Sequence, residues 1–100
     1  MDTPISAKTA LLQILLTGDG YGLDLIERVK TRTAGQVLLN QGSVYPALLK
    51  LEKKGLVKRY PVKRLPDSRG RPRHYYGLTA PGRRSALNQG RYLASFFSPR

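Results

Sequence analysis

Three arginines alternate with glycine and proline in the second half of the chain, in the run Arg69-Gly70-Arg71-Pro72-Arg73. Guanidinium groups held in such a turn bind phosphate oxygens through paired N–H donors. Residues 50–84 hold twelve Lys or Arg against two acidic residues, so they carry ten of the twelve net positive charges. This concentration predicts a polyanionic partner, for which double-stranded DNA is the leading candidate. A basic surface kept only for solubility is the alternative.

Cations on both sides of this turn are expected to contact the DNA backbone. Such contacts position a protein on a duplex, and an arginine at the tip can also enter the minor groove. The expected residues of this group are Lys58, Arg59, Lys63, Arg64, Arg69, Arg71, Arg73 and His74.

Base reading needs a different surface, and the stretch from Asn40 to Gly55 predicts the helix that provides it. Asn40 can cap the first N–H groups, and Gly55 can adopt the left-handed conformation that ends a helix. One face of the helix carries Val44, Ala47, Leu48 and Leu51. The opposite face suits a major groove, and its expected DNA-binding residues are Gln41, Ser43, Tyr45, Pro46 and Lys50. For Tyr45, a buried ring and a phenol that contacts the sugar-phosphate backbone both remain open.

Catalysis and metal binding have little support in this composition. The chain has one His, six Asp or Glu and no Cys, so no disulfide and no cysteine-based metal site can form. His74 adjoins Arg73, where a contact to phosphate is more plausible than general-base catalysis; an ordinary strand histidine is the simpler interpretation. Gly18, Gly20 and Gly22 lack the preceding strand and the spacing of a nucleotide-binding loop. We therefore expect no enzyme, no cofactor and no metal.

Two helices are expected before the reading helix. Thr3-Pro4 predicts the start of the first, which runs to about Thr17, and the second is expected over Tyr21–Thr33. Its core-facing residues are expected to be Leu23, Ile26 and Val29, and its cations available to solvent or phosphate are Arg28, Lys30 and Arg32. The short apolar run Val37–Leu39 predicts a strand at the edge of a sheet.

A hairpin follows the reading helix. A strand-like run begins near Leu56, and a second run covers His74–Leu78, with Tyr76 and Leu78 on its packed face. Thr79 is expected to cap a last helix. This order predicts a mainly α fold with a small β-wing. It is a winged helix-turn-helix with a three-helix core, a two- to three-stranded wing and one C-terminal dimerisation helix. Residues 1–79 form the first part and residues 80–100 the last helix, in one compact unit.

The last helix carries an apolar seam at heptad spacing. Its members are Ala86, Leu87, Gly90, Leu93, Ala94 and Phe97. The first helix is also apolar on more than one side, where Leu12 and Leu16 extend it. Because an exposed stripe of this size invites aggregation, we expect these residues to join two copies of the chain, with a second backbone close to Gly90. The alternatives are a helix folded back on its own domain, and contacts of the two leucines with the wing strands.

Three blocks of the chain resemble the PadR-like family of transcriptional regulators. They are Y-G-L-D-L-I at 21–26, G-S-V-Y-P-A-L-L-K-L-E-K-K-G-L-V at 42–57 and G-R-P-R-H-Y-Y-G-L-T-A-P-G at 70–82, in the family's order and spacing. The resemblance implies that Ser43, Tyr45, Pro46 and Lys50 belong to the recognition helix, and Arg69 to Arg73 to the wing. It also implies a homodimer, joined through its first and last helices, that represses a nearby promoter.

Some members of the family release DNA when a small aromatic or lipophilic effector binds at the dimer interface. The resemblance implies such an effector for this chain. A repressor without an inducer is the alternative. Relative to longer members, we expect this chain to have one C-terminal helix, ending at Arg100, and no separate dimerisation domain.

A small basic structural protein is the competing class, either an RNA-binding module or a protein that coats DNA without reading it. The sequence has no recognisable aromatic sheet motif of the single-strand-binding type, which disfavours RNA. A third class, a winged helix that docks protein, would show little salt-sensitive duplex binding. The longest apolar run, Leu11 to Leu16 broken by Gln13, is far below the ~20 residues that cross a bilayer. We therefore expect no membrane partner and a cytoplasmic, nucleoid-associated location.

Overall fold

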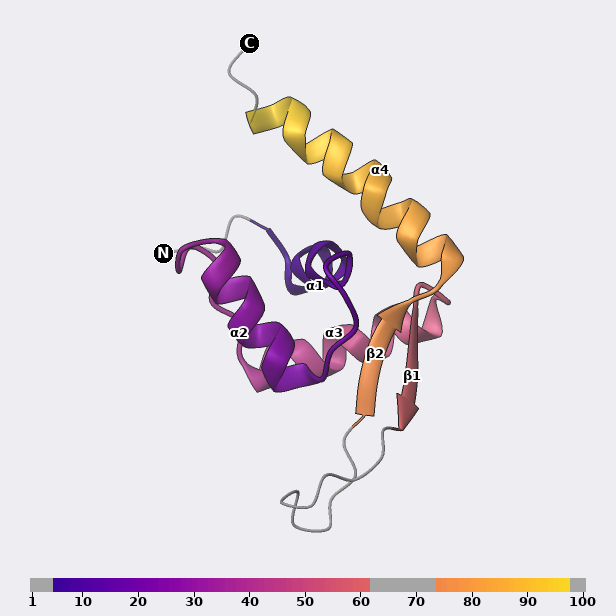
Figure 1. Cartoon of the computed structure of the whole chain (residues 1–100). Coiled ribbons are helices and arrows are strands. Elements are labelled where there is room, and N and C mark those ends of the chain that lie inside the picture. Colours follow the sequence, from indigo (N-terminus) through magenta and orange to yellow (C-terminus); the bar gives the residue numbers. More distant parts are fainter. Residues whose placement is uncertain (1–4, 62–73, 98–100) are drawn as a thin grey trace.

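The computed structural model describes residues 5–61 and 74–97, without the side chains of Pro61, Phe96 and Phe97. Its helices are α1 (Ala7–Leu15), α2 (Gly22–Arg32), α3 (Gln41–Lys53) and α4 (Ala80–Phe97), and its strands are β1 (Val57–Pro61) and β2 (His74–Leu78). Figure 1 shows α1 end-on at the centre, with α2 and α3 beside it, the two strands on one side and α4 running diagonally above. The predicted winged helix-turn-helix, mainly helical with a small sheet, is confirmed.

The core lies where α1, α2 and α3 meet. Leu11, Leu25 and Val44, one from each helix, are fully buried there. Val57 and Tyr76 from the sheet and Ala86 from α4 complete the same cluster. No polar or charged side chain of the described residues is buried, so hydrophobic burial accounts for the packing of these elements.

The two ends of α3 are fixed as its sequence predicts. The side chain of Asn40 accepts a hydrogen bond from the Ser43 N–H at 3.0 Å, and the Ser43 hydroxyl accepts one from the Asn40 N–H at 3.4 Å. This capping box satisfies N–H groups that a helix start leaves unpaired. At the other end Gly55 has φ +77°, in the left-handed region that glycine favours. The predicted bounds of this helix are confirmed.

The predicted start of the first helix is wrong. Helix α1 begins at Ala7, and its N-cap is Ser6, whose hydroxyl accepts a hydrogen bond from the Thr9 N–H at 3.2 Å. Thr3 and Pro4 lie outside the described residues. Ser6 is extended, and a serine hydroxyl three residues before a free N–H is as good a cap as threonine, so the later cap defines the helix.

The predicted core face of α2 is partly wrong. Leu23 is 50% exposed, whereas Leu25 is fully buried. Val29 is buried as expected, and Ile26 packs at the edge of the core. Since Leu25 and Val29 are four residues apart, they share one side of the helix and leave Leu23 on another.

The segment that pairs with β2 beside β1 is not the one that the sequence predicts. Strands β1 and β2 pair antiparallel, with Tyr60 opposite Tyr75. The run Val37–Leu39 forms no strand, so that prediction is wrong: Val37 is buried in the core and Leu38 is exposed. Instead Gly20, in the loop between α1 and α2, forms a bridge with Tyr76 through hydrogen bonds of 3.1 and 2.8 Å.

Helix α4 begins at the predicted cap. The Thr79 hydroxyl accepts from the Gly82 N–H at 3.0 Å and donates to the Gly55 carbonyl at 2.6 Å. Gln13 of α1 donates its side-chain amide to the Ala86 carbonyl at 2.8 Å. These contacts, with a hydrogen bond of 3.3 Å from Gln89 to the Thr9 hydroxyl, hold α4 on the core as far as its middle, while its C-terminal end stands away from the other elements (Figure 1). No helix among the described residues is long and apolar enough to cross a bilayer.

Candidate nucleic-acid interface

The outward face of α3 carries most of the predicted base-reading residues. Gln41, Pro46 and Lys50 are exposed there. Ser43 is half-buried, and its hydroxyl accepts the Asn40 N–H in the capping box. Its first role is therefore to fix the start of the helix.

Sequence reasoning missed one residue of this face. Leu49 is 49% exposed, in a helix whose other leucines, Leu48 and Leu51, are buried. The helical period held the signal, because Leu49 lies ~150° around the helix from the mean direction of the four buried residues.

Tyr45 is neither buried nor free. It is 41% exposed, and a Cβ built on Gly22 would lie 2.3 Å from its phenol oxygen. The ring therefore rests on the backbone at the start of α2, where only glycine leaves it room. This contact sets the outward face of α3 beside the first turn of α2.

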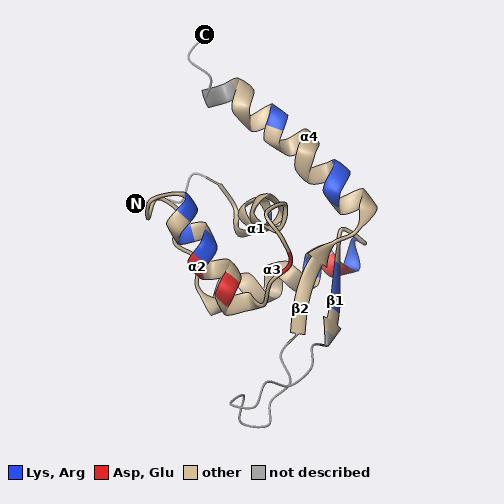
Figure 2. Cartoon of the chain, viewed as in Figure 1, with Lys and Arg blue, Asp and Glu red and all other residues tan. Residues whose placement is uncertain are grey.

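Some of the cations expected to contact phosphate lie among the described residues, and the others lie outside them. Lys58 and Arg59 are exposed on β1, where Arg59 Nε lies 3.6 Å from a carboxylate oxygen of Glu52, and His74 is exposed at the start of β2. Figure 2 shows Lys and Arg on α2, β1 and α4. The predicted phosphate contacts outside the described residues are Lys63, Arg64, Arg69, Arg71 and Arg73.

Arg28 is engaged inside the chain, so its expected availability to phosphate is wrong. It donates to Asp24 at 2.8 Å, to the Thr17 hydroxyl at 2.9 Å and to the carbonyls of Gly18 and Asp19. This arginine closes the turn between α1 and α2. Lys30 and Arg32, further along α2, are exposed as expected.

The same turn holds the hairpin. The Tyr60 hydroxyl of β1 donates to the Asp19 carboxylate, and a Cβ built on Gly77 of β2 would lie 2.5 Å from Asp19 Oδ1. The ring of Tyr75 lies 5.7 Å from that of Tyr21 and 6.3 Å from that of Tyr60, measured between centroids. Asp19 and this row of rings therefore fix both strands to the α1–α2 loop.

The Asp19 contact raises the pKa of Tyr60 from 10.0 to about 12, chiefly through the hydrogen bond, then through burial and the negative charge of Asp19. A raised folded pKa favours the neutral phenol, so its stabilisation is complete below pH ~10 and is lost as pH rises through ~12. We expect the free energy of unfolding to fall over this interval. Tyr60→Phe should be less stable than the wild type at neutral pH, and its free energy of unfolding should fall less between pH 8 and pH 11. Urea unfolding at these two pH values measures the fall in each protein. Equal falls in the wild type and in Tyr60→Phe would contradict the role of the Tyr60 hydroxyl.

Fewer residues of the expected dimer seam are free to contact a partner than the sequence predicts. Leu12 and Ala86 are buried inside the chain itself, so they offer no free surface to a partner. A Cβ built on Gly90 would meet the Gln13 side chain at 3.3 Å, and no backbone is as close. Leu87 and Ala94 are exposed, and Leu16 and Leu93 are half-buried. The side chain of Phe97 lies outside the described part of the chain.

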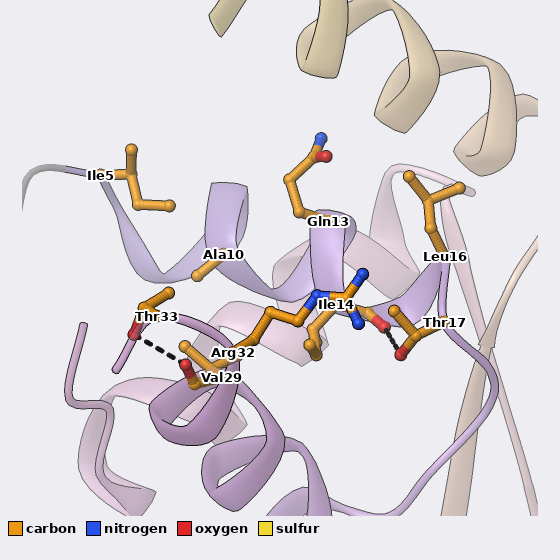
Figure 3. A pocket seen from close by; sticks show the side chains of 9 residues that line it. All are labelled: Ile5, Ala10, Gln13, Ile14, Leu16, Thr17, Val29, Arg32 and Thr33. Carbon is orange, nitrogen blue, oxygen red and sulfur yellow. Dashed lines mark hydrogen bonds between the residues drawn. The ribbon is translucent and has the colours of Figure 1, made fainter. Parts of the chain in front are cut away.

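A cavity of about 250 Å³ lies between α1 and α2. Figure 3 shows its lining side chains from both helices and their flanks, with Gln13 pointing toward α4. The apolar members are Ile5, Ala10, Ile14, Leu16 and Val29, and the polar ones are Gln13, Thr17, Arg32 and Thr33. Among the described residues no three His, Asp or Glu are grouped to hold a metal.

Comparisons with known proteins agree with this geometry. The family described as "Transcriptional regulator PadR-like family" matches residues 11–88. The fold is similar to a transcriptional regulator from Clostridium thermocellum, with TM-score 0.74 and 24% identity over 89% of this chain and 83% of that one. It is also similar to Pex from Synechococcus, with TM-score 0.67 and 30% identity over 90% and 84% of the two chains. A PadR family transcription regulator from Clostridium difficile has TM-score 0.71 and 27% identity over 91% and 88%. Among curated proteins there is no match.

Proposed function

This chain belongs to the PadR-like family of transcriptional regulators, and on that premise we propose that it is a homodimeric repressor that binds an inverted-repeat operator. As a member of this family it is a DNA-binding regulator of transcription and not an enzyme. The repressor role, the dimer, the operator symmetry, the cytoplasmic location on chromosomal DNA and the effector are our proposal.

The outward face of α3 is the observation that carries the proposal. The helix is capped at both ends, and its exposed Gln41 and Pro46 stand near its N-terminus, the end that enters a major groove in helix-turn-helix proteins. Lys50 and Lys53 are exposed toward its other end, and Lys58 follows on β1. Hydrogen-bonding and apolar groups framed by cations suit base edges framed by phosphates.

Homodimerisation is supported by the shape of α4. Its C-terminal end stands away from the core (Figure 1) and carries exposed Ala94 and half-buried Leu93. A second copy packed there in a twofold arrangement would place two recognition helices ~34 Å apart or a multiple of it, on one side of the duplex. The operator is then an inverted repeat.

Selection of bound duplexes from a random pool tests this function. The proposal predicts one enriched motif with two inverted half-sites and two protomers per duplex at saturation. Enrichment of no motif, with salt-sensitive binding retained, would instead identify a protein that coats DNA. Weak binding that is insensitive to salt would favour a protein-docking domain.

The wing arginines are expected to position the protein without specifying sequence. Arg71→Ala should weaken the selected site and random duplex by similar factors. It should also lower the slope of log affinity against log salt by about one for each phosphate that the arginine neutralises in the wild type. Titrations at several salt concentrations measure both quantities. A weakening confined to the selected site would make Arg71 a base reader.

An aromatic or lipophilic effector is the second part of the proposal, supported by the cavity between α1 and α2. Its volume of about 250 Å³ suits a compound of one ring, and Arg32 at its lining suits a carboxylate. We expect benzoate-like acids to weaken operator binding severalfold in the wild type and less in Arg32→Ala. Lys30→Ala removes an exposed cation that does not line the cavity and is the matched control. Unchanged operator affinity across the series would indicate a repressor without such an inducer.

A further inference from the structure

Leu49 stands out among the side chains of α3. It is 49% exposed, one turn after Tyr45 and directly before Lys50. At ~100° per residue, Gly42, Pro46 and Lys53 are its neighbours on the outward face. The core lies on the other side of the helix, so packing within the chain does not account for a leucine here.

A single exposed leucine is common on protein surfaces, and only its surroundings give it meaning. Here those surroundings are cationic, since Lys50 and Lys53 are exposed on the same stretch of helix. Two lysines disfavour an apolar protein partner and favour a polyanion. The occupant of this face is therefore DNA, and the leucine must meet some part of it.

The major groove offers one chemical group that rewards contact with an aliphatic side chain. Phosphates and base-edge nitrogens and oxygens would lose water beside Leu49 without gaining a hydrogen bond. The C5-methyl group of thymine, by contrast, is apolar and projects into the groove. Burying it against Leu49, with Pro46 and the ring of Tyr45 alongside, removes apolar surface from water on both molecules.

We propose that Leu49 is a specificity-determining residue that reads the C5-methyl group of thymine, with Pro46 and Tyr45 forming the rest of an apolar strip. This rests on the proposed function, since it takes α3 to be the helix that enters the groove. Lys50, directly after Leu49, and Gln41, two turns before it, supply the hydrogen bonds to other base edges. Operator half-sites should therefore contain at least one thymine whose methyl group is required.

Replacement of thymine by deoxyuridine tests the proposal, because it removes only the methyl group. Each thymine of the selected operator is replaced in turn, and affinity is measured at fixed salt. We expect the wild type to lose about fourfold at one or two positions in each half-site, which corresponds to burial of one methyl group. 5-Bromodeoxyuridine at the same position, whose bromine is similar in size to a methyl group, should restore affinity.

Three variants assign the effect to Leu49. Leu49→Ala should bind the thymine and uracil operators equally, and Leu49→Met, which keeps an apolar side chain, should retain the preference. Leu23→Ala removes an equally exposed leucine, 50% exposed on α2, and should also retain it.

The outcomes separate this proposal from the function on which it rests. A wild type that prefers its operator over random duplex but tolerates uracil at every position would overturn the role of Leu49 and leave the regulator intact. The same uracil penalty in Leu49→Ala as in the wild type would assign methyl reading to another residue. Failure to select any operator would remove the proposed function itself.

Discussion

Gly82→Ala is expected to destabilise the chain by about 3 kcal/mol, at the upper end of the usual cost of overpacking. A Cβ at this position would lie 1.8 Å from the carbonyl oxygen of Leu56, which is a backbone atom and cannot rotate away. The same carbonyl accepts the Thr79 N–H at 3.1 Å, so it is held in place. The start of α4 must then shift away from the segment that leads into β1. Thermal unfolding should show a midpoint lower by more than about 10 °C.

Gly90→Ala is the matched control in the same helix. Its Cβ would meet only the end of the Gln13 side chain, at 3.3 Å, and that side chain can move. Alanine is also the better helix former, by about 0.8–1 kcal/mol in a helix interior. Gly90→Ala should therefore be neutral or stabilising. Equal unfolding midpoints for the two variants would show that α4 does not dock through Gly82.

Leu93→Glu should turn the protein into a folded monomer that no longer binds the full operator. Leu93 is half-buried on the second half of α4, in the part of the seam left for a partner. A carboxylate in an apolar interface loses its hydration, which disfavours the dimer, while helix propensity changes little. Without the second half-site, operator affinity should fall by about 100-fold or more. Sedimentation and duplex titration of the same sample measure both effects.

Asn88→Glu controls for the added negative charge. Asn88 is exposed and lies on the side of α4 opposite the seam, so this variant should stay dimeric and bind nearly as the wild type. If Leu93→Glu remains a dimer and still protects a full inverted repeat, the subunits join elsewhere.

The sequence predicts best where short-range chemistry decides the structure. Asn40 and Gly55 mark the ends of α3 because a cap and a left-handed glycine act within a few residues. Thr79 marks the start of α4 for the same reason. The alternation in β2 likewise predicts that Tyr76 packs and Leu78 shares its face, since strand period is local.

The errors arise where distant segments decide. In α2, Leu23 and Leu25 are equally apolar, and only the position of α1 and α3 selects Leu25 for the core. The strand predicted at Val37 is wrong because an apolar run does not reveal its partner, and β2 instead pairs with Gly20. The bond between Asp19 and Tyr60 joins residues 41 apart in sequence, so no local pattern announces it.

In the candidate site, some residues lie where the sequence predicts and others have a place or a role that it does not reveal. Pro46 and Lys50 are on the exposed face that the helical period predicts, and Gln41 is exposed as the first residue of the helix. Ser43 is committed to the cap, and its place on a polar face does not by itself reveal that commitment. Leu49 escapes prediction because leucine usually packs, although the same period places it outward.

The ratio of affinities for the selected operator and for random duplex of equal length, at one fixed salt concentration, tests the central claim most directly. Phosphate contacts contribute to both complexes, so the ratio isolates what the face of α3 reads. A sequence-specific regulator should bind its operator about a thousandfold or more tightly than random duplex. A ratio near one would contradict the account and leave a basic protein that coats DNA without reading it.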